Sequence, residues 1–223
     1  MRQYFEISAD LKYLDEVNDR TTARQFIRQL LLPLPPTTAL TRHQEYLRGL
    51  VELPGPALDA QRAARRLQSA KPRPRTSRAA TALIAAARDL AFEAYHFQER
   101  IKHHIEGVVR IHISNASAEQ HKKKLGKVVR EYQKANDRLL RHRNFLVHGP
   151  RNRHDEFSDL RLAELAAITL HDDLWFEHAN VFEEYKEAWC GIANRLLRSI
   201  DSSLMIIQNE NENAIANGTL NFV

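Results

Sequence analysis

Hydrophobic residues recur at spacings of three, four and seven along most of this 223-residue chain, and stretches in which apolar and polar residues alternate are nearly absent. The first pattern places apolar side chains on one face of an α-helix, whereas alternation is typical of a β-strand. Only 7 Gly and 8 Pro interrupt the pattern, so long helical windows remain between them. The pattern therefore predicts an all-α protein.

Prolines and charges divide the chain into segments. We expect one short helix that ends at Leu32, another that begins at Thr37 or Thr38 and, after Pro54-Gly55-Pro56, an Ala/Arg-rich helix that ends near Ala70. The segment Lys71-Pro72-Arg73-Pro74-Arg75 has two prolines, which exclude a helix, and charges that keep it in solvent. The chain is thus interpreted as an N-terminal helical accessory segment (1–70), a basic linker (71–76), a helical bundle (77–210) and a polar tail (211–223).

Three long helices are expected in the bundle. The first covers residues 77–109. The second begins with a capping-box pattern at Ser117-Ala118-Glu119-Gln120 and runs to His148, where Gly and Pro follow. An apolar cluster comes next, and the last long helix covers about 179–207. The stretch 208–213 is too polar to bury, so we expect it to fray.

Basic residues exceed acidic residues, 33 to 28, which gives a net charge of +5 and a pI of about 9.4. The surplus is clustered, because residues 60–88 contain eight basic residues and no acid. Such clusters suit a nucleic-acid backbone, because each neutralised phosphate releases a counterion, although a solvated helix face carries similar charge. We therefore predict RNA as a partner. The predicted RNA-binding residues are Lys122, Lys123, Lys124, Lys127, Arg130, Lys134, Arg138, Arg141, Arg73, Arg75 and Arg78.

The second long helix separates an apolar face from a polar one near its end. Its apolar stripe consists of Leu125, Val128, Tyr132, Ala135, Leu139 and Leu146. On a helical wheel Asn144 and His148 lie about 40° apart, and each is roughly 160° from Leu146. Arg143 lies about 140° from His148, so the two converge only if the helix distorts or a second subunit contributes. This geometry predicts a site that is completed by dimerisation.

The stretch Arg143-Asn144-Phe145-Leu146-Val147-His148 resembles the Arg-x4–6-His signature of the HEPN superfamily, including the form with Asn after Arg and Gly after His. The resemblance covers about residues 77–210. It implies a HEPN-like bundle of long antiparallel helices, here with an N-terminal helical extension, and a homodimer formed through the motif-bearing helices. It also implies a metal-independent endoribonuclease without a cofactor, similar to toxins and abortive-infection antiphage proteins. An antitoxin protein or an inhibitory RNA is then a further expected partner.

In such a site the catalytic residues are Arg143, Asn144 and His148. A two-fold dimer places two copies of His148 across one cleft, where one acts as base and the other as acid in cleavage by the 2′-hydroxyl of RNA. Arg143 would hold the scissile phosphate, and Asn144 would orient His148 or the ribose. The alternative is a non-catalytic RNA-binding or scaffold module that acts with a regulatory RNA or a nucleotidyltransferase. In the plainest alternative, Arg143 lies along the bundle edge and His148 only caps a helix.

Other kinds of site have less support in the sequence. His142, His148 and His154 lack the spacing of metal ligands on a helix, and no metal is expected. The single cysteine, Cys190, excludes an internal disulfide. We find neither an apolar run resembling a signal peptide nor one of the roughly 18 to 20 residues that span a bilayer, so we expect a cytoplasmic protein with no membrane partner.

Overall fold

The computed structural model describes residues 46, 49–50, 52–72, 78–148, 156–169 and 174–220. Over these residues the prediction of an all-α fold is confirmed, and the only β pairing in the described ranges is a single antiparallel bridge between His112 and Leu220. The helix expected to end at Leu32 lies outside the described residues, and so does the start of the helix expected from Thr37 or Thr38. The named helices are α4 (Gly55–Ser69), α5 (Arg78–Arg110), α6 (Asn115–Ala135), α7 (Asp137–His148), α8 (Ser158–Thr169) and α9 (Leu174–Ala216).

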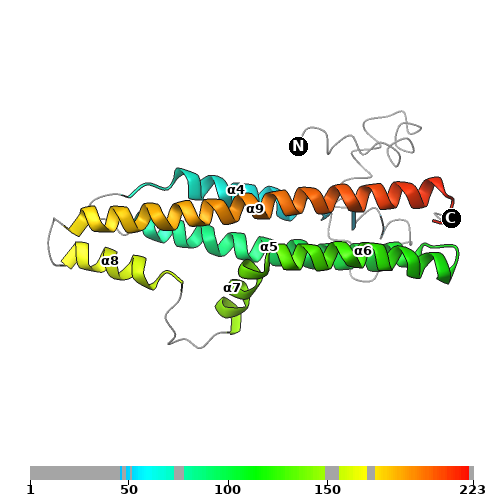
Figure 1. The fold of residues 1–223 in the computed structure, drawn as a ribbon, viewed down its shortest axis with the longest axis horizontal. Helices are drawn as coiled ribbons and strands as arrows, with labels where there is room; N and C mark the ends of the chain where they lie inside the picture. The colour runs from blue at the N-terminus through cyan, green and yellow to red at the C-terminus, as the bar shows by residue number, and fades with distance from the viewer. Residues whose placement is uncertain are drawn as a thin grey trace, which may run out of the picture.

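Two long helices, α5 and α9, form the frame of the molecule (Figure 1). At 1.5 Å per residue, their 33 and 43 residues give lengths of about 50 Å and about 65 Å. The helix α4 lies along α9 on one side, and α6 runs beside the C-terminal half of α9. The shorter helix α7 follows the C-terminal end of α6, contacts α5 and points away from the long axis of the bundle (Figure 1). No helix in the described part of the chain is long and apolar enough to cross a bilayer.

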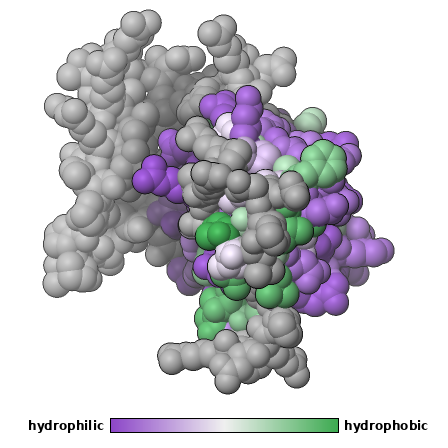
Figure 2. Space-filling view, turned by 90° about the vertical axis from the view of Figure 1, so that its left-hand side faces the viewer, coloured by the Kyte–Doolittle hydropathy of each residue, from purple (hydrophilic) through white to green (hydrophobic). Residues whose placement is uncertain are grey.

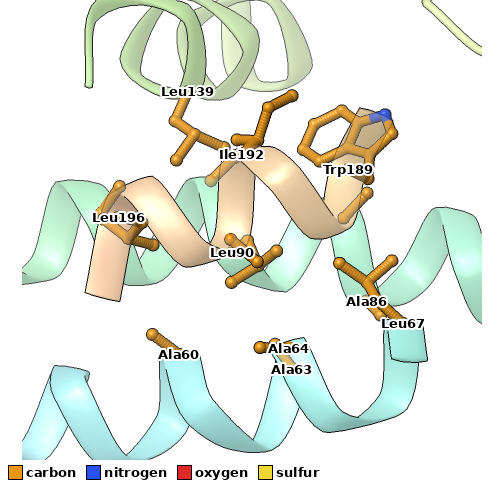
Figure 3. Packing of buried hydrophobic residues seen from close by; sticks show 14 of the residues in the cluster. Ala60, Ala63, Ala64, Leu67, Ala86, Leu90, Leu139, Trp189, Ile192 and Leu196 are labelled. Carbon is orange, nitrogen blue, oxygen red and sulfur yellow. The ribbon is translucent and has the colours of Figure 1, made fainter. Parts of the chain in front are cut away.

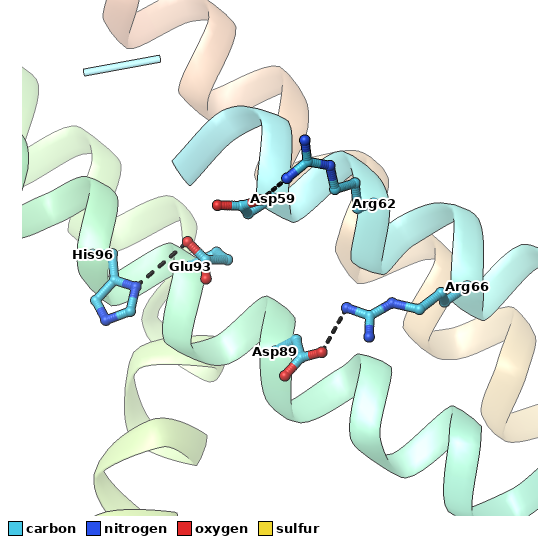
Figure 4. Close-up of polar contacts among 6 residues, drawn as sticks. All are labelled: Asp59, Arg62, Arg66, Asp89, Glu93 and His96. Atoms are coloured by element: carbon cyan, nitrogen blue, oxygen red, sulfur yellow. Dashed lines mark hydrogen bonds and ion pairs between the residues drawn. The ribbon is translucent and has the colours of Figure 1, made fainter. Parts of the chain in front are cut away.

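The helix α4 is part of the main hydrophobic core. Its Ala60, Ala63 and Leu67 are fully buried and share one cluster with α5 and α9 (Figure 3). Alanines at these contacts allow the helix backbones to approach closely, which is why the Ala-rich pattern produces tightly packed helices. An ion pair between Arg66 and Asp89 of α5, at 2.6 Å, lies at the edge of the same contact (Figure 4). Residues 55–69 therefore fold together with the bundle.

The prediction of one helix from Ser117 to His148 is wrong. The helix breaks at Asn136, whose φ of −115° and ψ of 18° are not helical. The buried Asn136 side chain donates through Nδ2 to the Tyr132 carbonyl at 3.0 Å and to Ser199 Oγ of α9 at 2.7 Å. Asn side chains compete in this way with the regular helical bonds. The start also differs, because Ser114 caps α6 by accepting from the Ser117 amide at 3.2 Å.

The predicted apolar stripe is confirmed in part. Leu125, Val128, Tyr132 and Leu139 are buried, whereas Leu146 is half-buried. Ala135 is exposed, because the break at the next residue ends the face that it was expected to share.

The last helix is longer at both ends than predicted. It begins at Leu174 and continues to Ala216, so the expectation that 208–213 frays is wrong. Asn211 is only 3% exposed and donates through Nδ2 to His104 Nε2 of α5 at 2.9 Å. The buried amide nitrogen of Asn211 thus has a hydrogen-bond partner on another helix.

The helix α8 packs against α9 with one face and leaves an apolar face uncovered. Leu160 and Ala167 are buried, but Leu162, Leu165 and Ile168 are at least half exposed. Figure 2 looks at this end of the molecule and shows hydrophobic side chains gathered on its lower part.

Candidate functional site

The motif-bearing helix α7 is anchored through Leu139 and His142, which are 2% and 6% exposed. The His142 ring lies against two aromatic rings, with centroids 5.9 Å from Phe157 and 5.4 Å from Trp189 of α9. Its Nδ1 is 3.3 Å from the carboxylate of Glu156, which also pairs with Arg138. These contacts fix α7 to the turn before α8 and to α9. The sequence does not predict that His142 anchors α7, because its partners lie in other segments of the chain.

Arg143 points toward the bundle and lies on an aromatic ring. Its guanidinium carbon is 3.9 Å from the centroid of Tyr95 of α5, a cation–π contact worth about 0.5–2 kcal/mol. Its Nη1 donates to Asn144 Oδ1 at 3.1 Å. The Nε atom is buried and has no hydrogen-bond partner in the described part of the chain. The structure thus brings Arg143 and Asn144 together and holds the guanidinium against α5.

His148 lies on a different face of α7. Both Asn144 and His148 are exposed, as the wheel predicts, and α7 stays helical to its last described residue. Among the described residues His148 makes no hydrogen bond, ion pair or ring contact. Because α7 is not distorted, Arg143 and His148 remain roughly 140° apart around the helix and do not converge within one chain. Gly149 and Pro150, which were expected to end the helix, lie outside the described residues.

Four basic residues of α6 form a row on its solvent face, and we call this row the α6 ridge. The ridge consists of Lys123, Lys127, Arg130 and Lys134. On a helical wheel they fall within about 60° of one another, opposite the buried residues, and they extend over about 16 Å. All four are exposed, and none has an ion pair with a described residue.

The other basic residues predicted to bind RNA are paired or lie elsewhere. Lys124 pairs with Glu210 at 2.8 Å, Arg141 with Asp137 at 2.5 Å, and Lys122 with Glu119 at 3.8 Å. Arg138 pairs with Glu156. Arg78 is exposed at the start of α5, whereas Arg73 and Arg75 lie outside the described residues. Pairing also reduces the charge of α4, because Arg62 contacts Asp59 and Arg66 contacts Asp89 (Figure 4).

A cluster of histidines at the far end of α5 and α6 was not predicted. His112 Nε2 lies 2.9 Å from His121 Nδ1, and His112 Nδ1 lies 3.0 Å from Ser117 Oγ. Burial lowers the pKa of His104 to about 3 and that of His121 to about 4, so both are neutral near pH 7. The turn between α5 and α6 brings these residues together, and their spacing in the sequence carries no signal of it.

The described residues give little support to a metal site or to a nucleophilic cysteine. No group of three or more His, Cys, Asp or Glu side chains there is placed to hold a metal ion. Burial raises the pKa of the half-buried Cys190 thiol, which disfavours the nucleophilic thiolate.

Comparison with models of known protein families finds no match to this chain, and comparisons with curated proteins and with solved structures find none either.

Proposed function

We propose that this protein is a HEPN-type, metal-independent endoribonuclease whose catalytic residues are Arg143, Asn144 and His148. The observation that carries the proposal is the Arg143–Asn144 pair. A guanidinium is held on Tyr95 and bonded to the neighbouring amide, and the same helix carries an exposed imidazole on another face at its end. An arginine fixed in this way is preorganised for a phosphate, because little side-chain freedom remains to be lost on binding.

The proposed reaction is attack of a ribose 2′-hydroxyl on the adjacent phosphorus. A base removes the 2′-hydroxyl proton, the P–O5′ bond breaks, and an acid protonates the departing 5′-oxygen. The products are a 2′,3′-cyclic phosphate and a 5′-hydroxyl, and the reaction consumes no metal or oxidant. Arg143 would neutralise the charge on the non-bridging oxygens, and His148 would supply one of the two proton transfers.

The second proton transfer is assigned to His148 of another copy in a homodimer. His148 has no partner within the described chain, and Arg143 faces elsewhere on the helix, so one chain provides an incomplete site. Val147 beside it is 45% exposed and Leu146 is half-buried, which leaves apolar surface on α7 for a second copy. A symmetric contact there would pair the two motif-bearing helices.

The α6 ridge is assigned to the RNA backbone. The four cations of the ridge are spaced over about 16 Å and have no acidic partner among the described residues, so they are available to a run of phosphates. Paired cations such as Lys124 and Arg141 are already neutralised by a carboxylate. The biological setting follows the resemblance in sequence. We propose a toxin or abortive-infection effector in the cytoplasm that is controlled by an antitoxin protein or an inhibitory RNA.

The second candidate is a non-catalytic RNA-binding or scaffold module that acts with a regulatory RNA or a nucleotidyltransferase. It is favoured by the engagement of Arg143 with Tyr95 and by the absence of any described partner that would orient His148. In this case the α6 ridge binds RNA and α7 performs no chemistry.

Paired measurements of cleavage and affinity separate the two candidates. The variants are His148→Ala and, as a matched control, His103→Ala, which removes an exposed histidine from α5. The endonuclease proposal expects His148→Ala to abolish cleavage while RNA affinity stays within about twofold, and His103→Ala to change neither. RNA binding without cleavage by any of the three proteins favours the scaffold.

A further inference from the structure

The helices α6 and α9 run antiparallel and are tied together at two points. At one end Lys124 Nζ lies 2.8 Å from the Glu210 carboxylate, and at the other Asn136 Nδ2 donates to Ser199 Oγ at 2.7 Å. Between these contacts lies a groove with a volume of about 550 Å³. This volume falls in the range of roughly 300–1,000 Å³ that is typical of small-molecule sites.

Short side chains on α9 create the groove. Ser199, Ser202 and Ser203 face α6 at positions where larger apolar residues would fill the space. The floor is formed by Val128 and Tyr132, which are 5% and 1% exposed. The Tyr132 hydroxyl donates to the Ala94 carbonyl of α5 at 2.9 Å, so this polar group is satisfied on the far side of the floor. The groove therefore has an apolar base beneath polar walls.

The walls carry polar groups that the protein leaves unbonded. Ser203 is 5% exposed and lines the groove, yet its hydroxyl takes part in no hydrogen bond with a described residue. Ser199 differs, because its Oγ donates to the Leu196 carbonyl in the usual manner of a helical serine. On the opposite wall the exposed Glu131 carboxylate has no ion pair with a described residue. The Ser203 hydroxyl oxygen is accessible from the groove, so it can donate to or accept from a ligand there.

Lys127 belongs both to the groove and to the α6 ridge. A polyanion that follows the ridge would pass along the mouth of the groove. Its attached groups would meet an apolar floor, the Ser202 and Ser203 hydroxyls, which can donate or accept, and the Glu131 carboxylate, which accepts. These features match a nucleobase, which has apolar faces and carries both N–H donors and acceptors on its edge.

We propose that the α6–α9 groove binds an unpaired base of a single-stranded RNA whose backbone lies on the α6 ridge. This inference rests on the proposed function only in taking RNA as the ligand, and it does not require cleavage. Bases in a duplex are paired and stacked and cannot enter the groove, so the site selects single strands. The hydroxyls and the carboxylate can form hydrogen bonds with the edge of any of the four bases in some orientation. The groove therefore selects single-stranded over double-stranded RNA and does not select a sequence.

The test places a large side chain in the groove at an exposed position, where the substitution does not disturb the core. Ser202 is exposed and lines the groove, whereas Asn194 is an exposed polar residue of α9 that does not line it. The variants are Ser202→Trp and, as the matched control, Asn194→Trp, with circular dichroism to confirm folding. The probes are an unstructured 12-nucleotide RNA and the fully paired duplex of the same sequence, with affinity read by fluorescence anisotropy at one salt concentration.

We expect the wild type to bind the single strand about tenfold more tightly than the duplex, in line with the contribution of one docked base. Ser202→Trp removes this preference and leaves duplex affinity unchanged, and Asn194→Trp retains it. RNA that contains 4-thiouridine should crosslink to peptides of α6 and α9 in the wild type. Two results would overturn the proposal that the groove binds an RNA base. One is equal binding of the two RNAs by the wild type, and the other is unchanged single-strand binding by Ser202→Trp. Cleavage that depends on His148 tests the proposed function separately from these results.

Discussion

The guanidinium of Arg143 lies 3.9 Å above the ring of Tyr95, which joins the motif-bearing helix α7 to α5. The contact keeps the arginine from turning into solvent, so the ring of α5 sets the direction from which a phosphate meets it. We predict that Tyr95→Leu, which keeps apolar volume but removes the aromatic face, lowers cleavage roughly 2- to 30-fold, the equivalent of about 0.5–2 kcal/mol. Tyr95→Phe should retain wild-type cleavage, because the face remains. Equal loss in both variants would argue against the stacking role.

The anchor of α7 gives a stability prediction. His142 fills a space between Phe157 and Trp189, so His142→Ala leaves a cavity and releases Glu156 from one partner. We expect the free energy of unfolding, measured in urea, to fall by about 2–3 kcal/mol. The exposed His103→Ala should change it by less than about 0.5 kcal/mol. A similar small effect in both variants would show that α7 is held by other contacts.

The α6 ridge is tested by the salt dependence of RNA binding. Arg130 has no ion pair with a described residue, whereas Arg141 pairs with Asp137. If Arg130 contacts a phosphate of a single strand, Arg130→Gln reduces the slope of log affinity against log salt by about 0.7. Arg141→Gln removes the same side chain and should leave the slope unchanged. Equal reductions would mean that the paired and unpaired cations are used alike.

The histidine cluster predicts a loss of stability in acid. The pKa values of about 3 for His104 and about 4 for His121 lie below the ordinary value of about 6.5. Between these values the unfolded chain binds more protons than the folded one, so the free energy of unfolding falls as pH drops from about 6.5 toward 4.

Each of the two histidines contributes at most about 1.4 kcal/mol per pH unit in this window. His121→Gln should reduce the slope by one such contribution in urea unfolding measured from pH 7.5 to 4.5. Comparison with the wild type cancels the carboxyl groups that both proteins share. Parallel profiles for wild type and variant would contradict the assignment of buried neutral histidine.

Local pattern was sufficient to predict the helices α4 and α5. Their alanines and leucines repeat at helical spacing without interruption, and prolines lie before α4 and between the two helices. The break at Asn136 was not predictable in the same way. Asn is tolerated inside helices, and what ends the helix here is a hydrogen bond to Ser199, which is 63 residues away.

In the candidate site, too, some features could be predicted from the local pattern and others depend on contacts between distant segments. The exposure of Asn144 and His148 follows from the helical wheel, because both lie away from Leu146. The packing of Arg143 on Tyr95 depends on how α7 crosses α5, and the pairing of Lys124 with Glu210 depends on how α6 meets α9. These contacts join distant segments, so charge counting along the chain could not separate the α6 ridge from its paired neighbours.

The proposal that α7 carries a ribonuclease site is tested most directly by the chemistry of the RNA ends. Purified wild-type and His148→Ala proteins are incubated with total RNA in excess EDTA, and the new termini are identified. The account predicts cleavage by the wild type alone, leaving 2′,3′-cyclic phosphate and 5′-hydroxyl ends. Intact RNA with both proteins, or equal cleavage by both, would contradict it.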